Sequence, residues 1–407
     1  MNLPLKIARR YFFSKKREGG INLINIISGI SLLGYIVGAA ALIIVLSVFN
    51  GFESLFASFY TNFDSDIRIT PIEGKHIRND EINWAAFNKI EGIETYARVI
   101  EENVLLRYNN QQSIATLKGV DTNYVKVTHY DSIIISGYVD VRHDSIYAIV
   151  GQGLAYQLSI DPNNLFKPLA IYVPKRETQT LINAENAFNK SLVMPSGVFS
   201  VQEDVDNKYV ICPIGFAQAL LEKENDFSAI EIRVKKGYSV DKIKSEIAQI
   251  TNNAFTIKNR FEQRDAFYKV MRSEKAISFI ILFFILLIAA SNTISSLYIL
   301  VMEKKRDLLL FKSMGLTEDM AKGIFRYEGL LIAVAGGIIG IVLGLLLCFL
   351  QEYFGLIALE GASQVSFSAY PVKVNWEDVI IVFFTVVILG FLTTVYPAQK
   401  AKQVVSD

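Results

Sequence analysis

Charged residues interrupt the apolar sequence in the segment Val301-Met-Glu-Lys-Lys-Arg-Asp-Leu-Leu-Leu-Phe-Lys-Ser-Met-Gly315, which continues as Leu316-Thr-Glu-Asp-Met-Ala-Lys-Gly-Ile-Phe-Arg-Tyr-Glu-Gly329. Gly315 can end one helix in the left-handed conformation that suits glycine. Thr317 can cap the next helix, with acidic residues at its positive end. The segment is therefore predicted to hold a short helix against a membrane, between two membrane spans. A solvated connector is the competing interpretation.

The rest of the composition supports a membrane protein. Of the 407 residues, 51% are hydrophobic, and the mean hydropathy is positive. Four uncharged runs are long enough to cross about 30 Å of hydrocarbon as helices that rise about 1.5 Å per residue. The predicted spans are residues 24–49, 276–302, 329–351 and 379–399.

These spans divide the rest of the chain. The divisions are an N-terminal helix (1–23), a large insert (50–275), the connector (303–328), a loop (352–378) and a tail (400–407). Lysine and arginine gather in the N-terminal segment, the connector and the tail, whereas the loop carries one lysine, Lys373. Because positive flanks stay in the cytoplasm, both termini and the connector are predicted to be cytoplasmic, and the insert lies outside.

The N-terminal segment has a basic amphipathic pattern. Leu3, Ile7 and Tyr11 recur at a spacing of four among six basic residues up to Arg17. Such a helix suits an anionic inner leaflet. A secretory signal is the alternative, but the apolar run that follows is too long and lacks a convincing cleavage site.

Small and polar residues within the spans predict how the helices pack. Gly34 and Gly38 lie four apart in the first span, so another helix can approach closely there. The third span repeats this spacing at Gly336, Gly340 and Gly344. The second span holds polar side chains that need partners at membrane depth, through interhelical hydrogen bonds or by lining a substrate path. These are Ser291, Asn292, Thr293, Ser295 and Ser296.

The insert has a mixed α/β pattern. A strand near Ala229, a helix from Ser239 to about Ile250 and a returning strand near Phe255 form one predicted unit. A similar order of strand, helix and strands begins at Ile67, so the insert is expected to contain a pseudo-repeat. The middle, residues 146–213, is predicted to be β-rich with turns at its Xaa-Pro pairs.

The sequence contains no recognisable catalyst. It has no Gly-x-x-x-x-Gly-Lys-[Ser/Thr] loop, no His-Glu-x-x-His and no Gly-x-Ser-x-Gly. The spacing of His76, His129 and His143 suits no common zinc site, and Cys212 and Cys348 lie in regions too different to form a disulfide. Basic and aromatic residues are not interleaved as a nucleic-acid groove requires. We therefore expect neither an enzyme, nor a metal site, nor nucleic-acid binding.

Three sequence phrases resemble one family. The order Glu303-Lys-x-x-Asp307, three aliphatic residues, then Lys312-x-Met-Gly315, resembles the coupling segment of the ABC permeases that include LolC, LolE, MacB and FtsX. Residues 22–53, with Asn-Leu-Ile-Asn-Ile-Ile-Ser-Gly-Ile-Ser and later Leu-Ser-Val-Phe-Asn-Gly-Phe-Glu, resemble the first span of the lipoprotein-releasing members. Tyr396-Pro-Ala is similar to the end of their last span.

The resemblance implies a fold and a separate ATPase partner. The fold is a polytopic α-helical membrane protein of type VII ABC (MacB-like) architecture: four transmembrane helices, with a large mixed α/β periplasmic domain inserted between the first and second. That domain would comprise a porter-like and a smaller β-rich part. The partner would be a separate LolD-like ATPase subunit that binds ATP and Mg, so this chain itself is expected to hold no cofactor. The implied ATPase-coupling residues are Glu303, Lys304, Asp307, Leu309, Lys312, Gly315 and Glu328.

The resemblance also implies a substrate. Two permease chains, identical or related, would sit in a bacterial inner membrane among its lipids, extract the acyl anchor of a lipoprotein and pass it to a LolA-like periplasmic carrier. Residues 175–189 are a hypothesis for the carrier contact. The implied lipoprotein or helix interface comprises Ile30, Gly34, Gly38, Leu42, Phe49, Gly336, Gly340 and Gly344. The alternatives are a MacB-like or FtsX-like permease that drives an envelope enzyme or efflux partner, and a membrane-anchored sensor or scaffold without ATP coupling.

The predicted orientation has a direct test. A reporter enzyme that is active only outside the cytoplasm should be active when fused near Asn225, because long inserts follow the orientation set by the basic flanks. The same reporter fused after Lys402 should be inactive. Activity of the second fusion and silence of the first would reverse the orientation.

Overall fold

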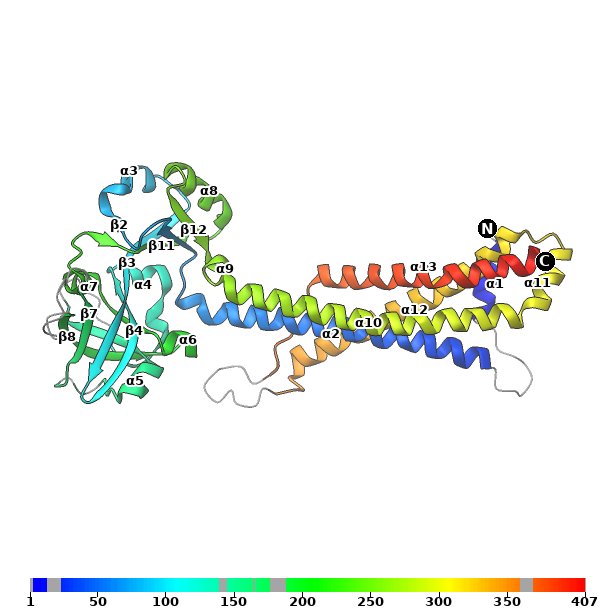
Figure 1. Ribbon diagram of the computed structural model, residues 1–407, viewed down its shortest axis with the longest axis horizontal. Coiled ribbons are helices and arrows are strands. Elements are labelled where there is room, and N and C mark those ends of the chain that lie inside the picture. The colour runs from blue at the N-terminus through cyan, green and yellow to red at the C-terminus, as the bar shows by residue number, and fades with distance from the viewer. Residues whose placement is uncertain are drawn as a thin grey trace. The chain divides into compact units, whose positions relative to one another are not determined.

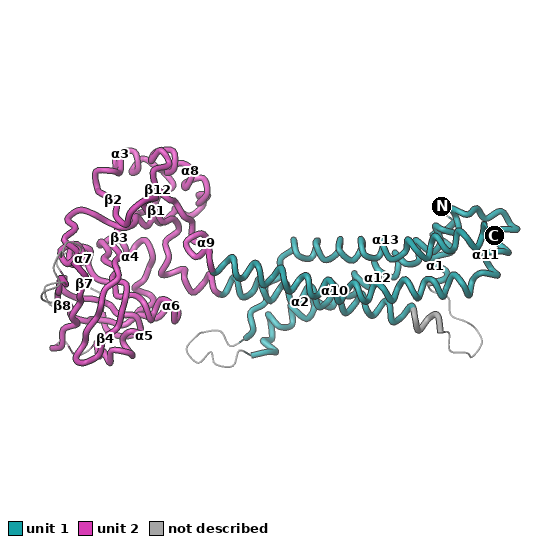
Figure 2. Tube along the Cα trace, viewed as in Figure 1, with its two compact units in different colours: residues 1–55, 267–407 teal, residues 56–266 magenta. Residues whose placement is uncertain are grey.

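The computed structural model describes residues 3–12, 23–138, 145–162, 164, 166–175, 188–358 and 369–406 (Figure 1). The chain forms two compact units (Figure 2). Residues 1–55 and 267–407 make the helical unit, and residues 56–266 make the α/β unit.

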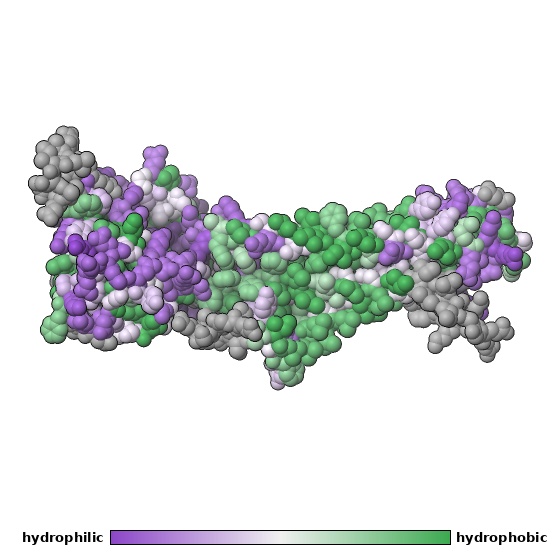
Figure 3. All heavy atoms as spheres, turned by 60° about the horizontal axis from the view of Figure 1, so that its bottom comes forward, coloured by the Kyte–Doolittle hydropathy of each residue, from purple (hydrophilic) through white to green (hydrophobic). Residues whose placement is uncertain are grey.

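Long helices build the helical unit. Four helices in the described part of the chain are long and apolar enough to cross a membrane. They are α2 (Leu23–Phe59), α10 (Asp265–Glu303), α12 (Glu318–Phe354) and α13 (Trp376–Ser406). Hydrophobic residues cover much of their outer surface (Figure 3). The expected four-span fold is confirmed, and each helix continues beyond the uncharged run that predicted it.

Two short helices complete the helical unit. They are α1 (Leu3–Phe12) and α11 (Lys305–Ser313). α1 packs against α12, and its Ala8 is fully buried. The expected amphipathic helix therefore turns one side to the protein, while Lys6, Arg9 and Arg10 remain exposed.

Glycines bring the long helices close together. A Cβ atom at Gly336 of α12 would lie 2.7 Å from the Cβ of Tyr35 in α2, too close for a real contact. One at Gly34 of α2 would lie 2.7 Å from the Cβ of Ala289 in α10. The glycine rows therefore serve packing inside the bundle, as their spacing predicts.

The α/β unit contains the remaining elements. Its strands are β1 (Ile67–Pro71), β2 (Ile77–Arg78), β3 (Ile93–Tyr108), β4 (Gln111–Val120), β5 (Ile134–Gly137), β6 (Tyr147–Gly151), β7 (Leu169–Pro174), β8 (Phe188–Phe199), β9 (Tyr209–Pro213), β10 (Asp226–Phe227), β11 (Ala229–Val234) and β12 (Phe255–Asn259). Its α-helices are α3 (Trp84–Phe87), α4 (Tyr124–Thr128), α5 (Gln152–Leu158), α6 (Glu203–Asp206), α7 (Ile214–Leu221), α8 (Val240–Ile250) and α9 (Arg260–Gln263). Short 3-10 helices lie at Tyr60–Asn62, Asn79–Glu81 and Tyr130–Ile133.

Two β-α-β units form one antiparallel sheet at one end of this unit. The sheet has the order β12-β1-β11-β3, so the first unit (β1, α3, β3) interleaves with the second (β11, α8, β12). Ile69 and Ile232 pack with Phe87 of α3 and Ile247 of α8 in one core. The expected pseudo-repeat is present, although its two halves are not separate domains.

The β-rich part is a closed barrel. β3 pairs β4, β4 pairs β9, β9 pairs β6, β6 pairs β8, β8 pairs β7, and β7 pairs β3 again. Leu106, Leu117, Val150, Ile171 and Val210 pack in its core. The 16-residue strand β3 belongs to both the sheet and the barrel, and it therefore joins them.

A buried charge network lies where β1, β11, β3 and β4 run side by side. Arg68 lies 2.7 Å from Glu101 and 3.3 Å from Glu231, and Lys118 lies 2.9 Å from Glu231. Lys118 is 2% exposed. Burial alone would raise the pKa of Glu101, but the charges of Arg68 and Lys118 outweigh it and lower the pKa from 4.5 to about 2.

This network makes the stability of the α/β unit depend on pH in the acidic range. The folded pKa of Glu101 lies below its ordinary value of 4.5, so its stabilising contribution is complete above pH 4.5 and is lost as pH falls towards about 2. Glu101→Gln should lower stability at pH 7 and flatten the dependence on pH across this window. Denaturant unfolding of the full chain, followed by fluorescence, measures both.

Glu94→Gln is the matched control. Glu94 lies on the same strand at an exposed position. The control should leave the slope of the unfolding free energy against pH as it is in the wild type. If Glu101→Gln also keeps the wild-type slope, Glu101 is not the source of the pH dependence.

Candidate coupling site

The connector between α10 and α12 is a short helix with defined ends. Gly315 has a φ of +98°, which favours glycine, and the N–H of Leu316 donates to the carbonyl oxygen of Phe311 at 2.9 Å. The hydroxyl of Thr317 then accepts a hydrogen bond from the N–H of Met320 at 3.3 Å. The predicted stop and start signals act as expected, and they fix α11 in place.

One side of α11 is anchored in the bundle. Leu308 is fully buried. It belongs to the same apolar core as Ile324 and Phe325 of α12 and Val404 of α13. Apolar packing therefore joins α11 to the core that α12 and α13 share.

The other side of α11 is open. Leu309, Leu310 and Met314 are 39%, 65% and 82% exposed. Exposed charged residues surround them, namely Glu303, Lys305, Arg306 and Lys312. We call the exposed residues Leu309, Leu310, Lys312 and Met314 the coupling surface. Apolar side chains inside a charged rim are the usual composition of a protein docking site.

Two more of the sequence-predicted residues join this helix to α1. Lys304 lies 3.3 Å from Asp307 and 5.4 Å from the ring centroid of Tyr11. Burial, with the negative charges of Asp307 and Glu328, raises the pKa of Tyr11 from 10.0 to about 12. The Tyr11 hydroxyl therefore stays protonated at neutral pH, so the contact that Tyr11 makes with Lys304 adds no negative charge to the site.

Glu328 differs from the other predicted coupling residues in its burial, although it lies close enough to Lys304 and Tyr11 to interact with them electrostatically. It is 4% exposed within α12, and its Oε2 atom has no hydrogen-bond partner in the described part of the chain. It therefore does not reach the coupling surface in this conformation. Gly315, by contrast, lies two residues after α11 and directly follows Met314 of that surface.

The residues proposed for a lipoprotein or helix interface fall into two groups. Gly34 and Gly38 face α10, whereas Gly336, Gly340 and Gly344 face α2. Leu42 is also fully buried, and Phe49 is half-buried. Ile30 is 52% exposed and forms an open edge of α2 with Leu33 (58%) and Val37 (62%).

Sequence reasoning missed a polar cluster at the opposite end of the bundle. The ammonium of Lys275 donates to Asp378 at 2.9 Å and to the amide oxygen of Asn50 at 2.9 Å. The amide nitrogen of Asn50 donates to Asp378 at 2.7 Å. These residues come from α10, α13 and α2, so the cluster, here called the clasp, joins three helices.

The clasp lies beside a close backbone contact. A Cβ atom at Gly51 would collide with the carbonyl group of Pro371, and the N–H of Lys373 donates to the carbonyl oxygen of Ser47 at 2.9 Å. This contact explains why glycine follows Asn50. Lys275 and Asp378 each directly precede an uncharged run. That position at one membrane boundary was the signal that could have paired them.

Two protein families together match most of the chain. The MacB-like periplasmic core domain family matches residues 28–250, and the FtsX-like permease C-terminal family matches residues 279–404. A LolC lipoprotein-releasing transmembrane protein of Neisseria meningitidis is 25% identical over 99% of this chain and 97% of its own. LolC of Buchnera aphidicola is 24% identical over 93% and 92%, and LolE of Haemophilus influenzae is 22% identical over 98% and 97%.

The chain belongs to the MacB- and FtsX-like superfamily of ABC-transporter permeases, in the family that includes LolC and LolE. It is therefore the membrane subunit of a transporter, an inner-membrane protein with a periplasmic domain between its first and second transmembrane helices.

The clasp should stabilise the helical unit. Lys275→Met leaves the largely buried carboxylate of Asp378 without its cation, at a cost of about 3 kcal/mol, and should lower the temperature at which the detergent-solubilised chain unfolds. The exchanged pair Lys275→Asp with Asp378→Lys should recover much of the loss.

Lys373→Met is the control for this series. Lys373 is an exposed lysine near the same end of the bundle, and it donates to the hydroxyl of Ser54. Its removal should change the unfolding temperature little. Equal losses in Lys275→Met and Lys373→Met would show that the clasp has no special role.

Proposed function

We propose that this chain is the permease of an ATP-driven complex that extracts outer-membrane lipoproteins from the inner membrane and passes them to a soluble periplasmic carrier. The full-length similarity to LolC and LolE proteins supports this proposal. The observation that carries it is the coupling surface on α11, open on one side and anchored by Leu308 on the other.

The coupling surface suits a cytoplasmic ATPase subunit. Leu310 and Met314 supply apolar contact area, while Lys312 and Glu303 add charge complementarity. ATP and Mg would bind to that partner, in agreement with the absence of a phosphate-binding loop from this sequence. Both chain termini would then be cytoplasmic.

The helices of this chain can carry a movement that starts when the ATPase subunit binds ATP. α10 is one uninterrupted helix of 39 residues, and α11 follows after Lys304. A shift of α11 therefore moves α12 and α13 through Leu308 and moves α10 through the chain itself. Rigid helices that slide or tilt as units are a usual means of carrying conformational change.

Extraction of a lipoprotein from the membrane needs the energy that ATP hydrolysis supplies. Each methylene of an acyl chain gains about 0.8 kcal/mol from burial in the membrane, so several chains hold a lipoprotein firmly. The open edge of α2, formed by Ile30, Leu33 and Val37, is an apolar surface where an acyl chain or a second permease chain could bind. The buried glycines stabilise α2 behind that edge.

The carrier contact remains a hypothesis. Residues 176–187, the centre of the proposed segment 175–189, lie outside the described residues. A second candidate function is an FtsX-like permease that drives another envelope partner, which the FtsX family match favours. Stimulation of ATP hydrolysis by an acylated lipoprotein distinguishes the first function from the second.

Docking through α11 can be tested by one substitution. Leu310→Asp places a charge in the apolar part of the coupling surface and should reduce co-purification of the ATPase subunit at least ten-fold, because an interface core excludes unpaired charge. Quantitative immunoblotting after affinity purification of this chain measures the amount of ATPase subunit that co-purifies. Gly315→Pro should act similarly, since proline cannot adopt the φ of +98° found there.

Matched substitutions in the α/β unit provide controls. Ile114 is 76% exposed, and Gly237 has a φ of +93°. Ile114→Asp and Gly237→Pro should keep the ATPase bound. Normal ATPase binding by Leu310→Asp, or release of lipoproteins by a purified chain without any ATPase, would refute the proposed mechanism.

A further inference from the structure

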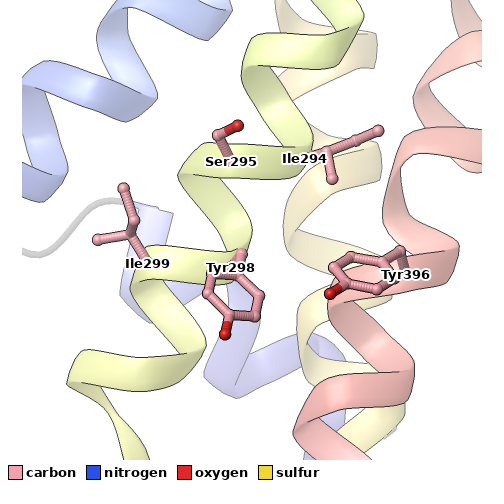
Figure 4. A pocket seen from close by; sticks show the side chains of 5 residues that line it. All are labelled: Ile294, Ser295, Tyr298, Ile299 and Tyr396. Atoms are coloured by element: carbon pink, nitrogen blue, oxygen red, sulfur yellow. The ribbon is translucent and has the colours of Figure 1, made fainter.

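An open groove lies between α10 and α13, and none of its lining residues belongs to the coupling surface or the clasp. Its volume is about 350 Å³ (Figure 4). Four lining residues come from α10 and one from α13: Ile294, Ser295, Tyr298, Ile299 and Tyr396. Isoleucines make part of the wall, and hydroxyl groups lie beside them, so the groove has an apolar and a polar part.

The two tyrosines mark the polar part. Their rings stack with centroids 6.1 Å apart and planes inclined by 22°. The hydroxyl of Tyr298 points towards the C-terminal end of α10, and the side chain of Tyr396 extends towards Tyr298 (Figure 4). Tyr396 is 58% exposed. Tyrosines with an apolar ring and an outward hydroxyl are typical of the level where hydrocarbon meets lipid headgroups.

Positive charge lies just beyond the tyrosines. Lys400 follows Tyr396 by four residues, so it occupies the same face of α13 one turn later. Lys305 and Arg306 begin α11, close after the end of α10. In the described part of the chain none of these three forms an ion pair with a carboxylate, whereas the neighbouring Lys402 lies 3.6 Å from Glu318.

The last part of α10, from the groove to the end of the helix, spans about one membrane leaflet. Ile294 lies nine residues before Glu303, where α10 ends, or about 14 Å along the helix axis. Half of the hydrocarbon core measures about 15 Å. An acyl chain beside the isoleucines would therefore bring its glycerol to the tyrosines and its phosphate to the lysines.

We propose that this groove binds an anionic phospholipid of the leaflet on the side of the chain termini. Ile294 and Ile299 contact one acyl chain, the hydroxyls of Tyr298 and Tyr396 donate to ester or phosphate oxygens, and Lys400 and Lys305 attract the negative headgroup. Uncompensated positive charge at the headgroup level selects an anionic over a neutral lipid. The site requires neither an ATPase nor a lipoprotein.

Native mass spectrometry of the detergent-solubilised full chain tests the site. The chain is incubated with equal amounts of phosphatidylglycerol and phosphatidylcholine of matched acyl length, and the retained lipids are counted. We expect the wild type to retain phosphatidylglycerol roughly ten-fold over phosphatidylcholine. Lys305→Gln with Lys400→Gln should remove this preference, and Tyr396→Ala should lower retention of both lipids.

The control removes the same charge elsewhere. Lys322→Gln with Lys373→Gln, on α12 and in the loop before α13, should keep the wild-type preference. Glycerol phosphate, a headgroup without acyl chains, should not compete. Equal retention of the two lipids by the wild type, or an unchanged preference in the Lys305 and Lys400 variant with an unchanged unfolding temperature, would overturn the proposal.

Discussion

The burial of Leu308 is the contact on which the functional account depends. A helix of nine residues is too short to be stable alone, so α11 needs tertiary packing to keep its place. Leu308 supplies it by joining the core shared by α12 and α13. Without this contact, a partner bound to Leu310 and Met314 would move a loose segment, and the bundle would not respond.

The opposite end of the bundle is constrained by polar groups. The clasp of Asn50, Lys275 and Asp378 joins α2, α10 and α13 where the chain leaves the hydrocarbon region. Between the two ends, glycines such as Gly336 and Gly34 keep α12, α2 and α10 in close contact. The bundle therefore has an apolar anchor at one end, close helix packing along its length and a hydrogen-bonded junction at the other.

Much of this architecture could be predicted from local sequence. Uncharged runs predict spans because hydrocarbon excludes charge, and Gly315 and Thr317 predict helix ends because their backbone and side-chain preferences are local. The closed barrel and the clasp could not be predicted, since β7 pairs with both β3 and β8, and Lys275 lies 103 residues from Asp378. The sequence motif groups Glu328 with the other coupling residues, although the packing of α12 buries it.

The most direct test of the central claim is a distance measured across the clasp end. Spin labels at the exposed positions Arg272 of α10 and Glu377 of α13 report the separation of these helices by electron paramagnetic resonance. In complex with the ATPase subunit, this distance should change when ATP binds, and the change should disappear in Leu308→Ala. An unchanged distance in the wild type, with ATP hydrolysis intact, would contradict the account.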